Sequence, residues 1–118
     1  MMHITFIGGG NMATAIIAGL VKAAPCQISV VEPNADKRAQ LASQFRLTAL
    51  EQLPVYFGGN QVVVLAVKPQ QLREVCADLA GRLDGALVLS IAAGIGVPAL
   101  SRWLDGHERI VRVMPNTP

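Results

Sequence analysis

The sequence predicts an α/β fold in which a doubly wound parallel sheet carries helices on both faces. Three observations predict this fold: apolar runs rich in valine and isoleucine, amphipathic stretches that alternate with them, and short connections between the two. Apolar runs without polar alternation are typical of strands buried on both faces, as in a parallel sheet. Because strand–helix–strand crossovers are right-handed, few other topologies remain.

Five apolar runs are the predicted strands, and the last is the weakest. They cover residues 4–7, 28–31, 62–67, 86–93 and 110–114. Four helices are predicted between them, over residues 11–22, 34–44, 69–83 and 98–104. Pro69 and Pro98 mark two helix starts, since proline is favoured at the first helical position. Residues 52–60 match neither pattern, and we expect a loop or a short irregular helix there.

The composition is typical of a single globular domain. The 118 residues are 52% hydrophobic, 15% charged and 4% aromatic, and this composition excludes a disordered chain. The longest apolar runs are far shorter than the roughly 20 residues of a membrane-spanning helix, so we expect no membrane association. The N-terminus lacks the segments of a signal peptide, and we expect a cytoplasmic protein whose residues 1–118 form one domain.

Charge and motif content exclude further classes of function. The net charge is only +2, from scattered basic residues, and one Trp, one Tyr and three Phe offer little stacking surface. We therefore expect no nucleic-acid partner. Cys26 and Cys76 have no metal-binding or redox spacing and are expected to be reduced, structural thiols. No metal-ligand or catalytic motif occurs, so we expect no metal, no catalytic side chain, and any chemistry to come from a cofactor.

A glycine-rich segment after the first predicted strand matches the dinucleotide-binding fingerprint G-x-G-x-x-A. In such a loop Gly8 permits the tight turn, Gly10 lets a diphosphate approach the backbone, and Ala13 allows close strand–helix packing. The following helix directs free amides at the diphosphate. A glycine turn without a ligand is the alternative, but the position between strand and helix favours binding and a Rossmann-type sheet. The candidate cofactor residues here are Gly8, Gly9, Gly10, Asn11, Met12 and Ala13.

The end of the second predicted strand bears on the choice of cofactor. Glu32 lies about 20 residues beyond the glycines, where an acidic residue can bind the ribose 2′-hydroxyl of NAD. Asn34, Lys37 and Arg38 could instead receive the 2′-phosphate of NADP. A carboxylate beside a phosphate is unfavourable unless Glu32 points outward, and a solvated carboxylate at the strand end is a further alternative. NADP (as NADPH) and NAD both remain open.

Two later turns complete the candidate site. In open α/β sheets, ligands lie outside the carboxyl ends of the strands. The turn Ala66, Val67, Lys68 and Pro69 should therefore face the cofactor, although Lys68 could equally be solvated. Ile91, Ala92 and Ala93 follow the next strand in a segment with many small residues (90–96), which would leave room for a ring. A simple connection between strand and helix is the alternative there.

Four sequence blocks in this order resemble pyrroline-5-carboxylate reductases over the whole chain. They are Phe-Ile-Gly-Gly-Gly-Asn-Met-Ala at residues 6–13, Ala-Val-Lys-Pro at 66–69, Ser-Ile-Ala-Ala-Gly at 90–94 and Met-Pro-Asn-Thr-Pro at 114–118. The resemblance implies reduction of 1-pyrroline-5-carboxylate to L-proline by hydride transfer from NADPH or NADH, the last step of proline biosynthesis. It also implies a C-terminal helical domain that forms a homo-oligomer and much of the substrate pocket, and that domain is absent from this chain.

The resemblance assigns roles to particular residues. It implies that Asn34 holds the 2′-phosphate and that Asn116 and Thr117 lie on the substrate side. We expect the isolated chain to bind cofactor with negligible catalysis, and some of its apolar surface to face the helical domain. Two alternatives remain: another NAD(P)-dependent reductase of the hydroxyacid-dehydrogenase type, and a dinucleotide-sensing domain without catalysis.

Overall fold

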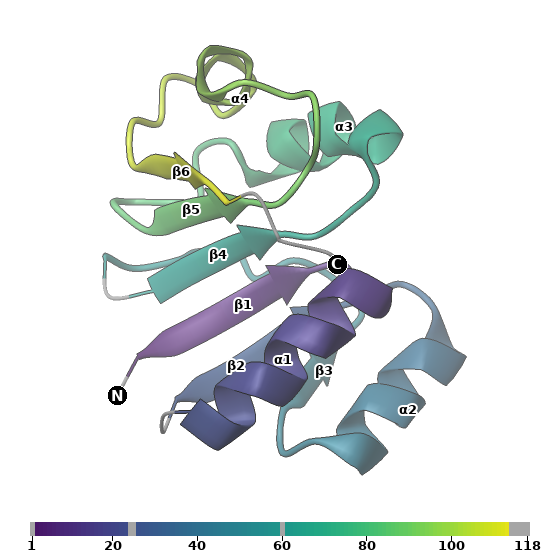
Figure 1. The fold of residues 1–118 in the computed structure, drawn as a ribbon. Coiled ribbons are helices and arrows are strands. Elements are labelled where there is room, and N and C mark those ends of the chain that lie inside the picture. The colour runs from purple at the N-terminus through teal and green to yellow at the C-terminus, as the bar shows by residue number, and fades with distance from the viewer. Residues whose placement is uncertain (1, 24–25, 60, 114–118) are drawn as a thin grey trace.

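A parallel β-sheet organises the fold. The computed structural model describes residues 2–23, 26–59 and 61–113, within which the chain forms six strands and four helices (Figure 1). In chain order they are β1 (His3–Ile7), α1 (Asn11–Ala23), β2 (Gln27–Val31), α2 (Ala35–Gln44), β3 (Thr48–Leu50), β4 (Gln61–Leu65), α3 (Pro69–Leu79), β5 (Leu87–Ser90), α4 (Val97–Trp103) and β6 (Ile110–Arg112).

The sheet has the order β3-β2-β1-β4-β5-β6, and every neighbouring pair is parallel. The first strand is central, so that Ile7 lies beside both Val31 of β2 and Leu65 of β4. From β1 the chain first adds β2 and β3 on one side, and it then crosses back to add β4, β5 and β6 on the other side. This is the doubly wound order, whose switch point lies between β1 and β4. The predicted fold class is confirmed.

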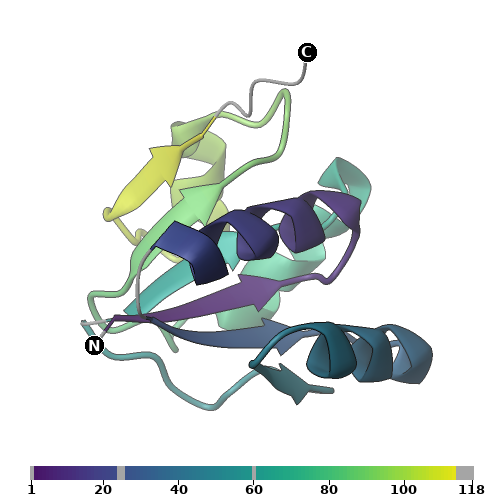
Figure 2. The same ribbon diagram turned by 60° about the horizontal axis from the view of Figure 1, so that its bottom comes forward.

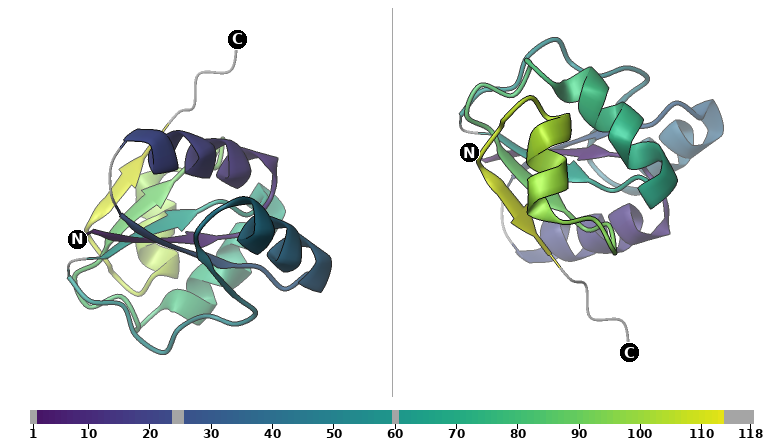
Figure 3. Two further views of the ribbon diagram at one scale, coloured as in Figure 1. Left: turned by 90° about the horizontal axis from the view of Figure 1, so that it is seen from below. Right: turned by 90° about the horizontal axis from the view of Figure 1, so that it is seen from above.

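Two apolar layers hold the helices on the sheet. On one face, Ile17 of α1 and Leu41 of α2 pack with Phe6 and Val30, and α2 lies beside β3 (Figure 2). On the other face, α3 and α4 pack over the β4–β6 half of the sheet. Figure 3 shows α1 on one side of the sheet and α3 and α4 on the other.

Helix α3 illustrates how the sequence produces this packing. Its buried residues Leu72, Cys76 and Leu79 are spaced by four and three positions, so they form one apolar stripe facing the sheet. Pro69 occupies the start of the helix, where its missing N–H has no cost. Each fully buried leucine contributes about 1.5–3 kcal/mol relative to exposure.

The structure differs from the predicted elements in a few places. The prediction lacked β3, which has only three residues and is held by pairing with β2. The helix predicted over 69–83 ends at Leu79, because Gly81 adopts a left-handed φ of 83° beyond the cap residue Ala80. The strands predicted over 62–67, 86–93 and 110–114 are shorter, and residue 114 lies outside the described residues.

The segment after β3 is a loop, as one of the two alternatives predicted. Residues 52–59 form neither helix nor strand, but Phe57 is fully buried and packs in the layer beneath α3. Among the described residues, no helix has the length and apolar character needed to cross a membrane.

Candidate cofactor-binding site

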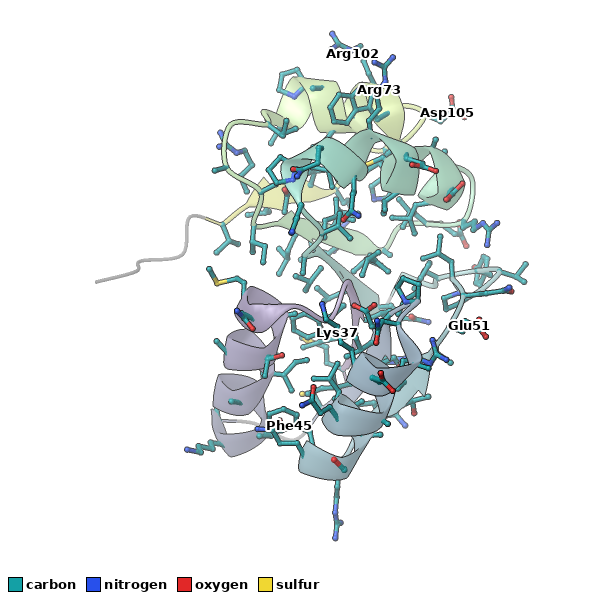
Figure 4. All side chains as sticks on the ribbon, turned by 90° about the vertical axis from the view of Figure 1, so that its right-hand side faces the viewer. Lys37, Phe45, Glu51, Arg73, Arg102 and Asp105 are labelled. Carbon is teal, nitrogen blue, oxygen red and sulfur yellow. The ribbon has the colours of Figure 1, made fainter. Side chains whose placement is uncertain are left out.

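A cleft of about 820 Å³ opens at the carboxyl ends of β1, β2 and β4. Its volume falls in the range of about 300–1,000 Å³ that is typical of small-molecule sites. The glycine loop and the β2 end line one side, and residues of α3 and of the segment after β3 line the other. Lys37 borders this cleft, and its side chain lies between the α1–α2 layer and the α3–α4 layer (Figure 4). The position is the one where open α/β sheets bind ligands.

The fold itself requires one of the three loop glycines and crowds a second. Gly8 has a φ of 102°, and a Cβ there would lie 2.9 Å from the carbonyl oxygen of Ala66. A Cβ on Gly9 would lie 2.8 Å from Cδ1 of Leu41. The backbone N–H of Gly8 donates to the carbonyl of Val31 at 2.9 Å, which ties the loop to β2. Gly8 therefore needs glycine whether or not a ligand binds, whereas a side chain at Gly9 would require the end of Leu41 to shift.

Gly10 is different, because a Cβ there would meet no atom of the described residues within 4 Å. Its φ also lies outside the left-handed region, so the backbone does not require glycine either. The space that a side chain would fill remains open beside the loop. A glycine without an intramolecular reason fits a ligand that closely approaches the backbone.

The start of α1 has the features of an anion-binding site. The N–H groups of Gly10, Asn11, Met12 and Ala13 donate to no acceptor within residues 2–23, 26–59 and 61–113. The first α1 turn contains no acidic side chain, so no carboxylate of the helix itself offsets its positive dipole end. Ala13 is fully buried against the sheet, which allows the helix to approach closely. Such a helix start can hold a phosphate or diphosphate.

Glu32 is buried at the base of the cleft, with 7% of its surface exposed. Its Oε1 accepts a hydrogen bond from the N–H of Gly9 at 3.0 Å, and its Oε2 accepts one from the N–H of Asn34 at 2.9 Å. The alternative of a solvated carboxylate is therefore wrong, because main-chain donors draw the side chain inward.

The turn between β2 and α2 presents its polar groups in different directions. Oδ1 of Asn34 accepts from the N–H of Lys37 at 3.0 Å and so caps α2. Nη1 of Arg38 donates to the carbonyls of Glu32 and Pro33, both at 2.9 Å. Lys37 lines the cleft, whereas Asn34 and Arg38 are not among its lining residues. Lys37 is therefore the cation that this turn directs toward a ligand.

The later turns divide between the cleft and its surroundings. Ala66, Val67 and Lys68 line the cleft, and the N–H of Ala66 extends the β1–β4 pairing by donating to the carbonyl of Ile7 at 2.9 Å. Pro69 is the first residue of α3 and lies behind this turn. The residues at the end of β5, namely Ile91, Ala92 and Ala93, do not line the cleft. Asn116 and Thr117 lie outside the described residues.

Sequence reasoning did not identify the far wall of the cleft. Leu53 of the loop and Gln71, Val75, Asp78 and Arg82 of the α3 region line it. The signal that could have found the α3 residues is their spacing by three and four positions in a helix that begins at the predicted cofactor turn. Leu53 and Val75 are partly buried apolar residues, and they suit a flat ring at this end of the cleft.

The described residues include candidate metal ligands and two cysteines. No group of three metal-ligating side chains occurs among them. Both cysteines are free thiols, and burial raises the pKa of Cys76 to about 11. A thiol with so high a pKa is a poor nucleophile at neutral pH.

Comparisons with known proteins agree with this geometry. Residues 3–94 match the model of the family described as "NADP oxidoreductase coenzyme F420-dependent". The chain is similar to the pyrroline-5-carboxylate reductases of Pseudomonas aeruginosa (43% identity over 98% of this chain and 44% of the relative) and Haemophilus influenzae (47% identity over 100% of this chain and 45% of the relative). It therefore spans less than half the length of these relatives, and they confirm the resemblance seen in the sequence blocks.

A solved structure supports the same relationship. The pyrroline-5-carboxylate reductase of Coxiella burnetii superposes with a TM-score of 0.83 at 37% identity, over 98% of this chain and 44% of that one. The agreement in fold thus extends over nearly the whole of the present chain.

Proposed function

This chain belongs to the family described as "NADP oxidoreductase coenzyme F420-dependent", and from that premise we propose that it is the dinucleotide-binding domain of a pyrroline-5-carboxylate reductase. The proposed activity is the reduction of 1-pyrroline-5-carboxylate to L-proline with NADPH, and NADH is the second candidate cofactor. The observation that carries the proposal is the open position beside Gly10, next to the amides of residues 10–13, which have no acceptor in the described part of the chain. The substrate in this proposal is taken from the names of the similar proteins given above.

The residues of the cleft fit a dinucleotide in three parts. The amides of Gly10 to Ala13 would hold the diphosphate, since they are donors at a positive helix end. The adenosine would extend past Glu32 toward Leu53 and Val75, whose apolar side chains suit the adenine ring. The nicotinamide would extend in the other direction, past Ala66 and Val67 toward residues 91–93, of which Ala92 and Ala93 are small. Among the other candidate residues, Lys68 borders this path, whereas Pro69 lies behind the turn and Arg38 braces the β2–α2 turn.

The turn after β2 favours NADPH over NADH. Lys37 lines the cleft and can pair with a 2′-phosphate. Asn34 can contribute its side-chain amide group, since only its oxygen is used in capping α2. The carboxylate of Glu32 is held inward by two amides, so it does not project toward the position of the 2′-phosphate.

The chain's own residues would act by binding and orientation. The bound nicotinamide supplies a hydride to the carbon of the cyclic imine. A protonated imine is already electrophilic, so a strong catalytic acid is not required, and alignment accounts for most of the rate. The ionisable side chains on the cleft walls, such as Lys68, Glu74 and Asp78, are not required as proton donors in this proposal. Asn116 and Thr117 are proposed to lie on the substrate side.

We also propose that residues 1–118 form one domain of a longer enzyme, with a helical domain that binds substrate and forms a homo-oligomer in the cytoplasm. Val111 and Val113 lie in and just after the edge strand β6, and they are 47% and 40% exposed. Val111 pairs with the partly buried Leu89 of β5, on the face that α1 covers only over the central strands (Figure 1). This uncovered apolar strip is a suitable surface for the second domain.

Two measurements test the proposal. Isothermal titration of the 118-residue chain with NADPH should give saturable binding, and the absence of binding would refute a dinucleotide site. The full-length enzyme should oxidise NADPH with 1-pyrroline-5-carboxylate. Turnover with a hydroxy or keto acid instead would favour a hydroxyacid-dehydrogenase type of reductase, and binding without any turnover would favour a sensing domain.

A further inference from the structure

Glu32 is a buried acidic side chain whose two oxygens are both occupied by main-chain donors. Oε1 accepts from Gly9 in the loop between β1 and α1, and Oε2 accepts from Asn34 in the turn between β2 and α2. In both bonds a main-chain N–H donates and a carboxyl oxygen accepts, and an ionised carboxylate can accept through both of its oxygens at once. Hydrogen bonds to a charged acceptor are stronger than neutral ones.

The backbone of Glu32 joins two further segments. Its N–H donates to the carbonyl of Leu50 in β3 at 2.8 Å. Its carbonyl accepts from Nη1 of Arg38 in α2 at 2.9 Å. One residue thus connects the glycine loop, the β2–α2 turn, α2 and β3. These are the segments that border the adenosine half of the cleft.

The position of Gly9 depends on this carboxylate. A Cβ on Gly9 would lie 3.3 Å from Oε1 of Glu32, so the loop and the carboxylate are in direct contact. If Glu32 turned toward a ribose, the buried N–H of Gly9 would lose its acceptor. An unsatisfied buried N–H is destabilising. The side chain is therefore committed to the protein rather than to the ligand.

We propose that Glu32 is a positioning residue that fixes the phosphate-binding loop relative to the β2–α2 turn, and that it does not act as an acceptor for ribose hydroxyls. This inference rests on the proposed dinucleotide site. The diphosphate is common to NADPH and NADH, so loosening the loop weakens both cofactors by the same factor. A ribose acceptor would behave differently, because only NADH offers a free 2′-hydroxyl at that place.

The hydrogen bonds are tested first, without any cofactor. In the unaltered chain, amide hydrogen exchange followed by NMR should show protected N–H groups at Gly9 and Asn34. In Glu32→Gln, the side-chain amide has only one acceptor oxygen, so exchange at one or both sites should accelerate about tenfold or more. Asp36→Asn is the matched control, since it removes an exposed carboxylate from the adjoining first turn of α2, and it should leave both sites unchanged. Unprotected amides in the unaltered chain, or equal protection in Glu32→Gln, would overturn the proposal.

Cofactor titration then separates positioning from ribose binding. Glu32→Gln should raise the Kd for NADPH and for NADH by a similar factor, roughly 10- to 100-fold, as expected for loss of a bond to a charged group. A loss confined to NADH, with NADPH unchanged or tighter, would show that Glu32 contacts the ribose. If the unaltered chain binds neither cofactor, the proposed function fails, whereas the exchange experiment still decides whether Glu32 holds the loop.

Discussion

Alanine substitutions at Gly10 and Gly8 should separate cofactor binding from folding. The two glycines lie two positions apart in one loop but face different surroundings. A methyl group on Gly10 enters open space, whereas one on Gly8 lies 2.9 Å from the carbonyl oxygen of Ala66 at a φ of 102°. We expect Gly10→Ala to lose NADPH affinity with little change in stability. We expect Gly8→Ala to be destabilised even without cofactor.

The magnitudes follow from these contacts. Gly10 precedes α1, and its carbonyl accepts from the N–H of Thr14 at 3.0 Å. Alanine is a poorer cap than glycine but also restricts the unfolded chain, and these opposing effects leave a net change within about 1 kcal/mol. In the complex, the added methyl would hold the diphosphate away from the amides. Losing one such bond costs about 1.5–3 kcal/mol, or roughly 10- to 100-fold in Kd. For Gly8→Ala, the left-handed φ alone costs about 1–3 kcal/mol.

Isothermal titration with NADPH and urea denaturation followed by circular dichroism measure the two effects. The expected pattern is a weak-binding but stable Gly10→Ala and an unstable Gly8→Ala. Binding of NADPH by Gly10→Ala at the affinity of the unaltered chain would refute the argument that the open space beside this glycine serves a ligand. A Gly8→Ala chain of unaltered stability would refute the argument from backbone strain.

Three further predictions concern charge, packing and thiol chemistry. Lys37→Ala should weaken the binding of NADPH about fivefold more than that of NADH, as loss of an ion pair of about 1 kcal/mol implies. Arg38→Ala should weaken the binding of both cofactors equally, because the Arg38 guanidinium braces two carbonyls. Titrations that give the opposite ranking would contradict this. Leu72→Ala removes a side chain with 0% exposure and should lower the free energy of unfolding by about 2–5 kcal/mol in urea; a loss under about 1 kcal/mol would contradict its burial. Because burial raises the pKa of Cys76 from 9.0 to about 11, the folded chain keeps a thiol proton that the unfolded chain loses, so stability should fall as pH rises through this interval. The Cys76→Ala chain should lack that part of the pH dependence, and iodoacetamide at pH 8 should modify Cys26 before Cys76.

The elements that the sequence predicts well are those with a local pattern. β1, the glycine loop and α1 are recognised because an unbroken apolar run, a fingerprint and a helical periodicity follow one another within about 20 residues. β3 has no such pattern. Its three residues include the exposed Thr48, and its structure depends on hydrogen bonds to β2. Because β2 is distant in the sequence, a short window around β3 contains no sign of this pairing.

The orientation of site residues was harder to predict than their position. Glu32 was recognised as an acidic residue at a strand end, but its partner Gly9 is 23 residues away, and only the folded backbone brings the two together. Arg38 and Lys37 are adjacent in the sequence, yet one braces the turn and the other lines the cleft. Helix geometry separates neighbours by about 100° around the axis, so small differences in register decide which cation faces a ligand.

The central place of the first strand has a consequence for how the chain can fold during its synthesis. Each strand, as it leaves the ribosome, finds a neighbour that has already been made: β2 joins β1, β3 joins β2, β4 joins the free side of β1, and β5 and β6 follow outward. The sheet can therefore grow from the N-terminus without separating a pair that has formed. The glycine loop is completed only when β4 arrives, because Gly8 rests against Ala66. A nascent chain that stops before β4 would carry the complete fingerprint sequence but not the surface against which its loop is shaped.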